Sequence, residues 1–553
     1  MDAHNSPGYY KENLEGVLER PIEKKIFFIF GLTIIFVLSV FSARLAYLQL
    51  IYGSEFKKRS ENNYLRIVEQ YPERGLIYDR EGLALAANKP IEYSGASDMY
   101  FSSSSAFSLI RRYPENGFLH LLGFLQKNGN ILRGASGIEL AYDDVMRGHP
   151  KQNIEEIDAN GEVFGYGVRS FLTEGFDVKT SISRGLQFQL SEFIEKIAKN
   201  RGFSGGAAIV MDVSNGNVLA IVSYPEFNPN LLVMGVTEQE FNKILNDSGK
   251  PFFNRALSGL YPPGSIIKPI IAAAALAENI INPAKIIITD GKLILPNPYA
   301  PDKPNVFLDW KNHGPVDMKK AIAVSSNVYF YSIGGGYGAQ RGLGIETINK
   351  YLRLFGFEQK TGIDIPGEQN GLLPDTRKIV NGRAWSIGDT YHASIGQGDI
   401  LVTPIQMAVY ATAIASNGTI FKPQIMDSIV DSNKHVIKKN NSKIKQTSVL
   451  DKKIFDVVKD GMRLAVTEGT AQGLSGFPFS VAAKTGTAEI GKTGKVHSWS
   501  IGFAPYENPK IAFAIIMENG QASNLVGATA VAAEMFAWMS DTKFLDTIGR
   551  LEN

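Results

Sequence analysis

The stretch that decides the fold is Tyr261-Pro262-Pro263-Gly264-Ser265-Ile266-Ile267-Lys268-Pro269, which leads directly into the apolar run IIAAAALA at 270–277. An apolar run of this length and composition is typical of a buried helix. Pro269 has no backbone N–H and is tolerated only in the first turn of a helix, so the helix is predicted to begin near Ser265. A serine at that place lies at the positive end of the helix dipole, where a developing oxyanion is stabilised.

Ser265 and Lys268 are three residues apart, so their side chains share one face of the helix. A lysine held among apolar residues has a lowered pKa and can accept a proton. The pair can therefore supply a nucleophile and its base without histidine. Ser-x-x-Lys is a frequent pattern, and polar copies stand at 54–57 and 442–445. Whether the copy at 265–268 is the catalytic one depends on the other motifs in the chain.

Composition bounds the possible functions. The chain has 553 residues, 44% of them hydrophobic and 20% charged, which is enough for two or three globular domains. Lys and Arg (57) nearly balance Asp and Glu (55), so no nucleic-acid partner is indicated. The absence of cysteine excludes disulfides, cysteine nucleophiles and thiolate metal sites. The seven histidines form no His-x-x-x-His pair, and we predict neither a metal nor a cofactor.

One segment near the N-terminus is long enough to cross a bilayer. Residues 26–43 carry no charge, and the apolar run continues to about residue 51. The alternative is a cleaved signal peptide, but its apolar core would be shorter and an A-x-A cleavage site is missing. We predict a cytoplasmic tail at 1–25 and a membrane anchor at 26–51. Positive charges flank the anchor on both sides, so the short tail, rather than charge, favours export of the remaining chain.

The pattern of apolar and polar runs divides the remaining chain into a mixed segment at 52–200, a larger domain at 201–545 and a tail at 546–553. The run 186–200 has helical periodicity and is predicted to connect the two domains. Two apolar runs at 207–213 and 218–224 flank Ser214-Asn215-Gly216-Asn217, a hairpin pattern. Helical runs fill 265 to about 425, and strand-like runs return at 480–490, 498–504 and 510–517. This order predicts an α+β fold, an antiparallel sheet covered by helices.

A second polar group interrupts the apolar segment AIAVSSNVYFYSIG at 321–334. Burying Ser325 and Asn327 there costs free energy unless their polar atoms are hydrogen-bonded. The pattern is also that of a helix cap or a packed turn. In a functional arrangement, Ser325 would relay a proton between Lys268 and a leaving group, and Asn327 would hold a substrate carbonyl and the lysine.

The third group is Lys484-Thr485-Gly486-Thr487, embedded in the apolar run SVAAKTGTAEI at 480–490. Other copies of Lys-Thr-Gly, at 360–362 and 492–494, lie outside apolar strands. Strand alternation places Lys484 and Gly486 on one side and both threonines on the other.

Two roles follow for this strand. Because Gly486 has no side chain, a substrate backbone could approach the strand and pair with its edge. The N–H groups of Thr487 and Ser265 could together form an oxyanion hole.

Each motif is weak alone, but the ordered set resembles the class B penicillin-binding proteins, and most of all their elongation-type members. The middle motif reads Ser-Ser-Asn here instead of the Ser-Asp-Asn spelling. Longer stretches carry the resemblance across nearly the whole chain after the anchor: ENN…ERGLIYDREG at 61–82, GASGIELAYDDVMRG at 134–148, GGAAIVMDVSNGNVLAIVSYPEFNPN at 205–230, DWKNHG at 309–314, ASIGQGDILVTPIQMA at 393–408 and FAPYENPKIAFAIIMENG at 503–520.

The resemblance implies a periplasmic peptidoglycan D,D-transpeptidase on the inner membrane, with 52–200 as a pedestal (dimerisation-like) domain and 201–545 as the transpeptidase domain. Ser265 would be the nucleophile, Lys268 its base, and Ser325 with Asn327 the second motif. Lys484, Thr485, Gly486 and Thr487 would bind the stem-peptide carboxylate and line the oxyanion hole. β-Lactams would acylate Ser265. The implied partners are a multi-span, lipid-linked glycan polymerase and other proteins of the rod complex.

Some relatives place a metal near the DWKNHG region, but Asp309 and His313 are too few ligands for us to predict a site. Alternative functions stay open at this point. A D,D-carboxypeptidase differs only in using water as the acceptor. A membrane-anchored β-lactamase or β-lactam sensor shares the three motifs, although the pedestal-like segment disfavours both. The protein could also act chiefly as a scaffold of the wall-synthesis complex.

Overall fold

The computed structural model describes residues 24–90, 109–114, 116–128, 131–157, 162–297, 300–377, 384–447, 450–491, 493–523 and 526–549. By its internal contacts the chain divides into two compact units. The first unit comprises Met1–Gln70 and Pro150–Leu172, and the second comprises Tyr71–His149 and Thr173–Asn553.

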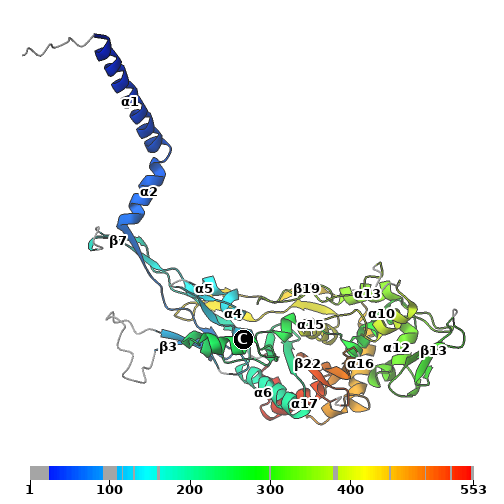
Figure 1. The fold of residues 1–553 in the computed structure, drawn as a ribbon. Coiled ribbons are helices and arrows are strands. Elements are labelled where there is room, and N and C mark those ends of the chain that lie inside the picture. The colour runs from blue at the N-terminus through cyan, green and yellow to red at the C-terminus, as the bar shows by residue number, and fades with distance from the viewer. Residues whose placement is uncertain are drawn as a thin grey trace, which may run out of the picture. The chain divides into compact units, whose positions relative to one another are not determined.

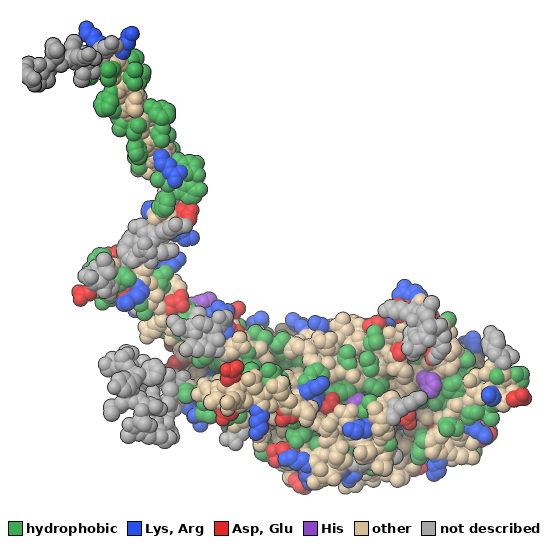
Figure 2. Space-filling view, in the orientation of Figure 1, with side chains coloured by type: hydrophobic (Ala, Val, Ile, Leu, Met, Phe, Trp, Pro, Cys, Tyr) green, Lys and Arg blue, Asp and Glu red, His purple; other side chains and the backbone are tan. Residues whose placement is uncertain are grey.

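The first unit begins with a long apolar helix, α1 (Lys24–Leu50). None of its residues is buried, and its apolar stretch is long enough to cross a membrane. Hydrophobic side chains dominate the surface of this helix in Figure 2. The helix fits the single-pass anchor predicted at 26–51. A second, polar helix, α2 (Gly53–Tyr64), follows it directly.

A three-stranded antiparallel sheet completes the first unit, with β7 (Lys151–Ile157) between β1 (Leu65–Gln70) and β8 (Val163–Ser170). In β8 the side chains of Phe164, Tyr166 and Val168 alternate with glycines and are 65%, 79% and 53% exposed. An edge strand thus presents an apolar stripe.

The second unit is built on a five-stranded antiparallel sheet of order β11-β10-β22-β21-β20. The hairpin predicted at 207–224 is confirmed as β10 (Gly205–Asp212) and β11 (Val218–Tyr224). The three late strands are confirmed as β20 (Ala482–Glu489), β21 (Lys495–Ala504) and β22 (Ile511–Gln521). The late strand β22 pairs with the early strand β10, so strands distant in the sequence are neighbours in this sheet. β20 forms one edge of the sheet.

Helices cover both faces of this sheet, as the α+β prediction required. Ile209 and Ala514 face the core under α15 (Pro404–Ala415), whereas Val210 and Phe513 face the opposite core, because successive strand residues point to opposite sides. Figure 1 shows α15 on one side of β22 and α6 with α17 on the other. The covering helices of that second face are α6 (Arg184–Arg201) and α17 (Ala528–Asp541).

The helix predicted at 186–200 is therefore present, as α6, but it is not a connector. It packs on β10 and β11 and belongs to the second unit. Its apolar side, including Leu186, Leu190 and Ile194, is fully buried against the sheet. The predicted helical middle is interrupted by two strand pairs, β12 (Ile287–Thr289) with β15 (Gly314–Val316) and β13 (Lys292–Leu295) with β14 (Asn305–Leu308).

The remaining helices and short strands of the second unit frame the sheet. The helices are α3 (Leu119–Leu122), α4 (Gly137–Ala141), α5 (Asp143–Arg147), α7 (Asn230–Met234), α8 (Glu238–Leu245), α9 (Arg255–Ser258), α10 (Lys268–Ala277), α11 (Met318–Ala323), α12 (Asn327–Gly334), α13 (Ile345–Leu354), α14 (Ile387–Ser394) and α16 (Lys452–Thr467), with the 3₁₀ turns η1 (Gly264–Ile267), η2 (Gln472–Leu474) and η3 (Phe544–Thr547). The strands are β5 (Leu125–Asn128), β6 (Ile131–Gly134), β12 (Ile287–Thr289), β13 (Lys292–Leu295), β14 (Asn305–Leu308), β15 (Gly314–Val316), β16 (Thr419–Lys422) and β19 (Lys443–Thr447).

A second large sheet joins segments that the sequence assigned to different domains. Its order is β18-β17-β9-β2-β3-β4. The strands are β2 (Ile77–Tyr78), β3 (Ala84–Pro90), β4 (Leu109–Arg112), β9 (Asp177–Thr180), β17 (Met426–Val430) and β18 (Val436–Lys439). Part of the segment 52–200 thus packs with the larger domain, and the predicted boundary at 200/201 stays a prediction.

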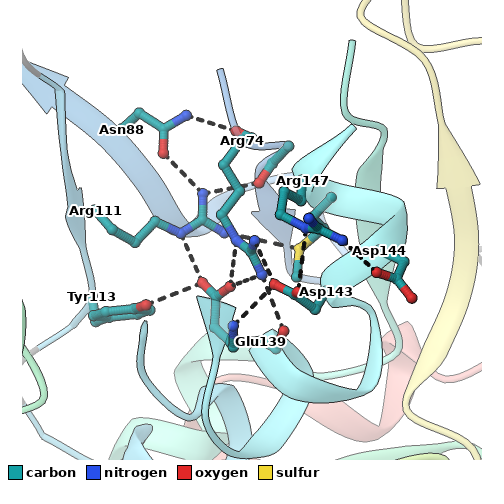
Figure 3. A network of polar contacts seen from close by, with 11 residues as sticks. Arg74, Asn88, Arg111, Tyr113, Glu139, Asp143, Asp144 and Arg147 are labelled. Carbon is teal, nitrogen blue, oxygen red and sulfur yellow. Dashed lines mark hydrogen bonds and ion pairs between the residues drawn. The ribbon is translucent and has the colours of Figure 1, made fainter. Parts of the chain in front are cut away.

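The charge-rich region at 72–82 takes part in a buried polar network through Arg74. The buried Glu139 carboxylate of α4 accepts hydrogen bonds from Arg74 Nε (2.7 Å), Arg111 Nε (2.8 Å) and the Tyr113 hydroxyl (3.1 Å). Arg74 also binds Asp143, which extends the network toward α5 (Figure 3). Removing one partner of such a buried ion pair costs about 3–5 kcal/mol, so this network fixes β4 and α4 in place.

Candidate active site

The apolar helix predicted after Ser265 is α10, and its first turns explain the proline. The 3₁₀ turn η1 carries Ser265, and the backbone N–H of Lys268 binds the Ser265 carbonyl as the α-helix begins. Pro269 occupies the first turn of α10, where an N–H would have no partner within the helix. Ser265 is half-buried and lies just before α10, whose residues after Lys268 are all apolar.

Lys268 is completely buried, and its Nζ has three acceptors nearby. These are the Ser325 carbonyl (2.7 Å), Asn327 Oδ1 (2.7 Å) and Ser325 Oγ (3.3 Å). The Phe330 ring lies below the amine, 5.4 Å from Nζ to the ring centroid. Two of the three predicted motifs are thus in direct contact.

The segment Ser325-Ser326-Asn327 contains the helix cap that its sequence allowed, and it also contacts Lys268. Ser326 is the helix cap: its Oγ accepts from the Tyr329 N–H (3.3 Å) at the start of α12 and donates to Asp309 Oδ2 (2.8 Å). Ser325 instead adopts a left-handed conformation, with φ of 58°. This conformation costs a non-glycine residue about 1–2 kcal/mol, and it directs the Ser325 hydroxyl toward the lysines.

Lys484 joins the same group from the edge strand β20. It is also completely buried, and its Nζ donates to Ser325 Oγ (2.9 Å) and to the Thr485 carbonyl (2.7 Å). The predicted alternation is confirmed, because Lys484 and Gly486 are buried while Thr485 and Thr487 are half-buried. The Ser325 hydroxyl therefore lies between two buried lysine amines.

Gly486 has a different neighbour from the one that the sequence suggested. A Cβ at this position would lie 2.9 Å from the Ile266 side chain and 3.2 Å from both the Ile266 nitrogen and the Pro263 carbonyl oxygen. The close approach is thus made by the chain's own Ser265 turn. Gly264, with φ of 57°, approaches the Thr487 carbonyl in the same way. These two glycines allow the turn and the strand to pack backbone against backbone.

One residue of this group was missed by the sequence analysis. The Thr470 hydroxyl accepts a hydrogen bond from the Thr485 hydroxyl (2.7 Å), and the Thr470 N–H binds the Ala323 carbonyl (3.1 Å). Thr470 follows α16 and precedes Thr485 by 15 residues. No local pattern marks it, since its position depends on tertiary packing.

Burial controls the charge of both lysines. Removal from water lowers the pKa of Lys268 to about 7, although the nearby Asp309 carboxylate partly opposes this shift. Burial, reinforced by the neighbouring Lys268, lowers the pKa of Lys484 well below its usual value. Because the two amines contact one hydroxyl, they titrate as a coupled pair. A neutral amine is therefore available near neutral pH.

In the part of the chain that the structure describes, no group of three or more His, Cys, Asp or Glu side chains is placed so that it could bind a metal ion. Asp309 and His313 therefore have no third protein ligand there. Asp309 instead binds the start of α12 through Ser326 and the Val328 N–H (3.0 Å). His313 Nε2 lies 3.6 Å from Asp309 Oδ1, and burial lowers the pKa of the imidazole.

Comparison with known proteins gives consistent matches. Residues 206–537 match the family model described as the penicillin-binding protein transpeptidase domain. The chain is 29% identical to the peptidoglycan D,D-transpeptidase MrdA of Acinetobacter baumannii, over 90% of this chain and 85% of that protein.

Two solved structures are similar over most of their length. Pseudomonas aeruginosa PBP2, in complex with WCK 5153, is 28% identical with a TM-score of 0.69, covering 86% of this chain and 97% of that one. Helicobacter pylori PBP2, in a complex with MreC, is 25% identical with a TM-score of 0.70, covering 87% of this chain and 99% of that one.

The environment of Lys268 predicts an unusual titration. With ¹³C-labelled lysine, the Cε resonance that disappears in Lys268→Gln should titrate with a midpoint near pH 7, so that the amine is protonated below and neutral above that pH. Exposed lysines in the same spectrum should titrate near 10.4. A midpoint above pH 9 for Lys268 would show that burial does not control its charge.

Proposed function

The chain belongs to the penicillin-binding protein transpeptidase family, and from that premise we propose that it is a serine-type D,D-transpeptidase that cross-links peptidoglycan stem peptides during cell elongation, most like penicillin-binding protein 2. The observation that carries the proposal is the contact of three separate motifs around one hydroxyl. The Nζ atoms of Lys268 (α10) and Lys484 (β20) lie 3.3 Å and 2.9 Å from Ser325 Oγ. Asn327 Oδ1, at the start of α12, lies 2.7 Å from Lys268 Nζ.

Acylation follows from this arrangement. The Ser265 hydroxyl gives its proton to neutral Lys268 as its oxygen attacks the carbonyl carbon of the penultimate D-alanine. The oxyanion is held by the N–H groups of Ser265 and Thr487. When the peptide C–N bond breaks, the proton passes from Lys268 through the Ser325 hydroxyl to the leaving D-alanine nitrogen. The product is an ester between Ser265 and the shortened stem peptide.

The second half of the reaction reverses these proton movements. An amine of a neighbouring stem peptide attacks the ester, loses a proton to the site, and forms the cross-link as Ser265 recovers its hydrogen. Lys484 and the threonines Thr485 and Thr487 bind the terminal carboxylate of the donor. A β-lactam enters the same acylation step, but its ring-opened acyl group stays on Ser265.

In the proposed topology, α1 anchors the protein in the inner membrane as a single-pass protein, with the pedestal and catalytic domains in the periplasm. The length and the apolar composition of α1 support the anchor. The partners are a multi-span, lipid-linked glycan polymerase and other proteins of the rod complex. Support comes from the relative from H. pylori that was solved with MreC, and from the exposed apolar stripe on β8.

A penicillin adduct tests the catalytic assignment. Incubation of the full-length protein with benzylpenicillin should add one ligand, on the tryptic peptide that contains Ser265, and the adduct should persist. Ser265→Ala should abolish it, and Lys268→Ala should slow it at least about 100-fold, since general-base catalysis contributes that much or more. Ser442→Ala, from the polar copy of the motif, is the matched control and should react normally.

The outcomes separate the alternatives. Rapid loss of the adduct with release of hydrolysed penicillin would indicate a β-lactamase. An adduct on another residue would refute the Ser265 assignment.

The stripe on β8 predicts the position of a partner surface. Tyr166→Glu places a charge at the most exposed position of the stripe and should reduce co-purification with the glycan polymerase at least about tenfold, because buried interface charges are costly. Acylation by benzylpenicillin should not change. Leu245→Glu, at a 54% exposed apolar position in the second unit, is the matched control. Normal co-purification of Tyr166→Glu would place the partner surface elsewhere.

A further inference from the structure

We propose that Glu518 is a positioning residue for the nucleophile, which it orients through the hydroxyl of Tyr261. Glu518 lies on β22, within the stretch 503–520 that carries the family resemblance, and its carboxylate binds Tyr261 and Arg255 rather than either lysine of the site. The inference deepens the proposed function and rests on it, because it concerns the turn that presents Ser265. The structure supplies three independent observations for it.

The first observation is the shared carboxylate. Glu518 Oε1 accepts the Tyr261 hydroxyl at 2.5 Å, and Oε2 accepts Arg255 Nε at 2.5 Å. All three residues are buried, with exposures of 7%, 5% and 5%. Hydrogen bonds to a charged acceptor are shorter and stronger than neutral ones, and stronger still away from water. Each oxygen therefore fixes one donor.

The second observation is that Glu518 and Arg255 have little freedom to move. The Arg255 Nη2 donates to the Gly249 carbonyl at 2.7 Å, and its backbone N–H donates to Ser223 Oγ at 2.9 Å. A Cβ at Gly205 would lie 2.7 Å from both Arg255 Nε and Glu518 Oε2. The ion pair thus packs directly on the backbone of β10. It gives the Tyr261 hydroxyl a rigid acceptor.

The third observation is that Tyr261 begins the turn that carries the nucleophile, four residues before Ser265. Its backbone pairs with Val402 through two hydrogen bonds of 2.9 Å, and its ring lies edge-on to His497 and Trp499. Trp499 Nε1 in turn donates to the Pro262 carbonyl at 3.1 Å. The start of the turn is therefore held by Tyr261 and Trp499, and the Glu518 carboxylate binds the Tyr261 hydroxyl.

The charges around Glu518 are consistent with this role. Arg255 is its ion-pair partner, and burial lowers the pKa of His497, so that this imidazole is neutral near pH 7. Trp499 also lies opposite Gly486 in the β20–β21 pair, directly beside the strand that packs on the Ser265 turn. A small displacement of Tyr261 would consequently move Ser265 relative to Lys268, and a misplacement of about 1 Å can slow an enzymatic reaction about 100-fold.

The test compares Tyr261→Phe, Glu518→Gln and their double variant in the full-length protein. Each should be acylated by benzylpenicillin at Ser265 to the same final stoichiometry as the wild type, but at least about tenfold more slowly at saturating penicillin. Because the two residues act through one hydrogen bond, the double variant should be little slower than either single variant. Tyr261→Phe keeps the ring and removes only the hydroxyl, so it tests the proposal even where Glu518→Gln folds poorly.

Glu139→Gln is the matched control, since Glu139 is also a buried carboxylate that binds arginine and tyrosine (Figure 3). Its partners Arg74, Arg111 and Tyr113 lie outside the three motifs of the site. It should lower the midpoint of thermal unfolding and leave the acylation rate within twofold. Wild-type rates for Tyr261→Phe and Glu518→Gln would overturn the proposal, as would an equal slowing in Glu139→Gln. If the proposed function itself is wrong, the wild type will not be acylated at Ser265. That result can be distinguished from failure of the positioning role, in which the wild type is acylated.

Discussion

The burial of two lysines around one serine hydroxyl is the constraint on which the rest of the structure depends. Lys268 and Lys484 are both fully shielded from water and both contact Ser325. Burying an ammonium group costs several kcal/mol unless acceptors surround it or it loses its proton. The site meets this cost in both ways. Acceptors surround each amine, and the depressed pKa values allow a neutral amine near pH 7.

The fold can be understood as the means of bringing these groups together. Lys268 comes from a helix, Ser325 from a turn before another helix, and Lys484 from an edge strand more than 150 residues later in the sequence. The five-stranded sheet, with a separate apolar core on each face, supplies the rigid support. Gly264 and Gly486 then let the Ser265 turn approach that strand at backbone distance. The strained backbone at Ser325 is retained because its hydroxyl is bound on both sides.

Much of this arrangement could be predicted from the sequence because it depends on local patterns. The start of α10 follows from Pro269 and the apolar run, the β10–β11 hairpin from its turn residues, and the orientation of Lys484 from strand alternation. Other features depend on contacts between distant residues. Neither the close neighbour of Gly486, nor the Thr470 partner of Thr485, nor the role of Glu518 leaves a local pattern.

The central claim is that Ser265 transfers its acyl group to an amine. The most direct test supplies the full-length protein, together with a glycan polymerase, with lipid-linked peptidoglycan precursor that bears D-alanyl-D-alanine stems, and measures released D-alanine and cross-linked stems in the same sample. The wild type should yield equal amounts of both, and Ser265→Ala should yield neither. Release of D-alanine without cross-links would identify a carboxypeptidase, and cross-linking by Ser265→Ala would contradict the assignment of the nucleophile.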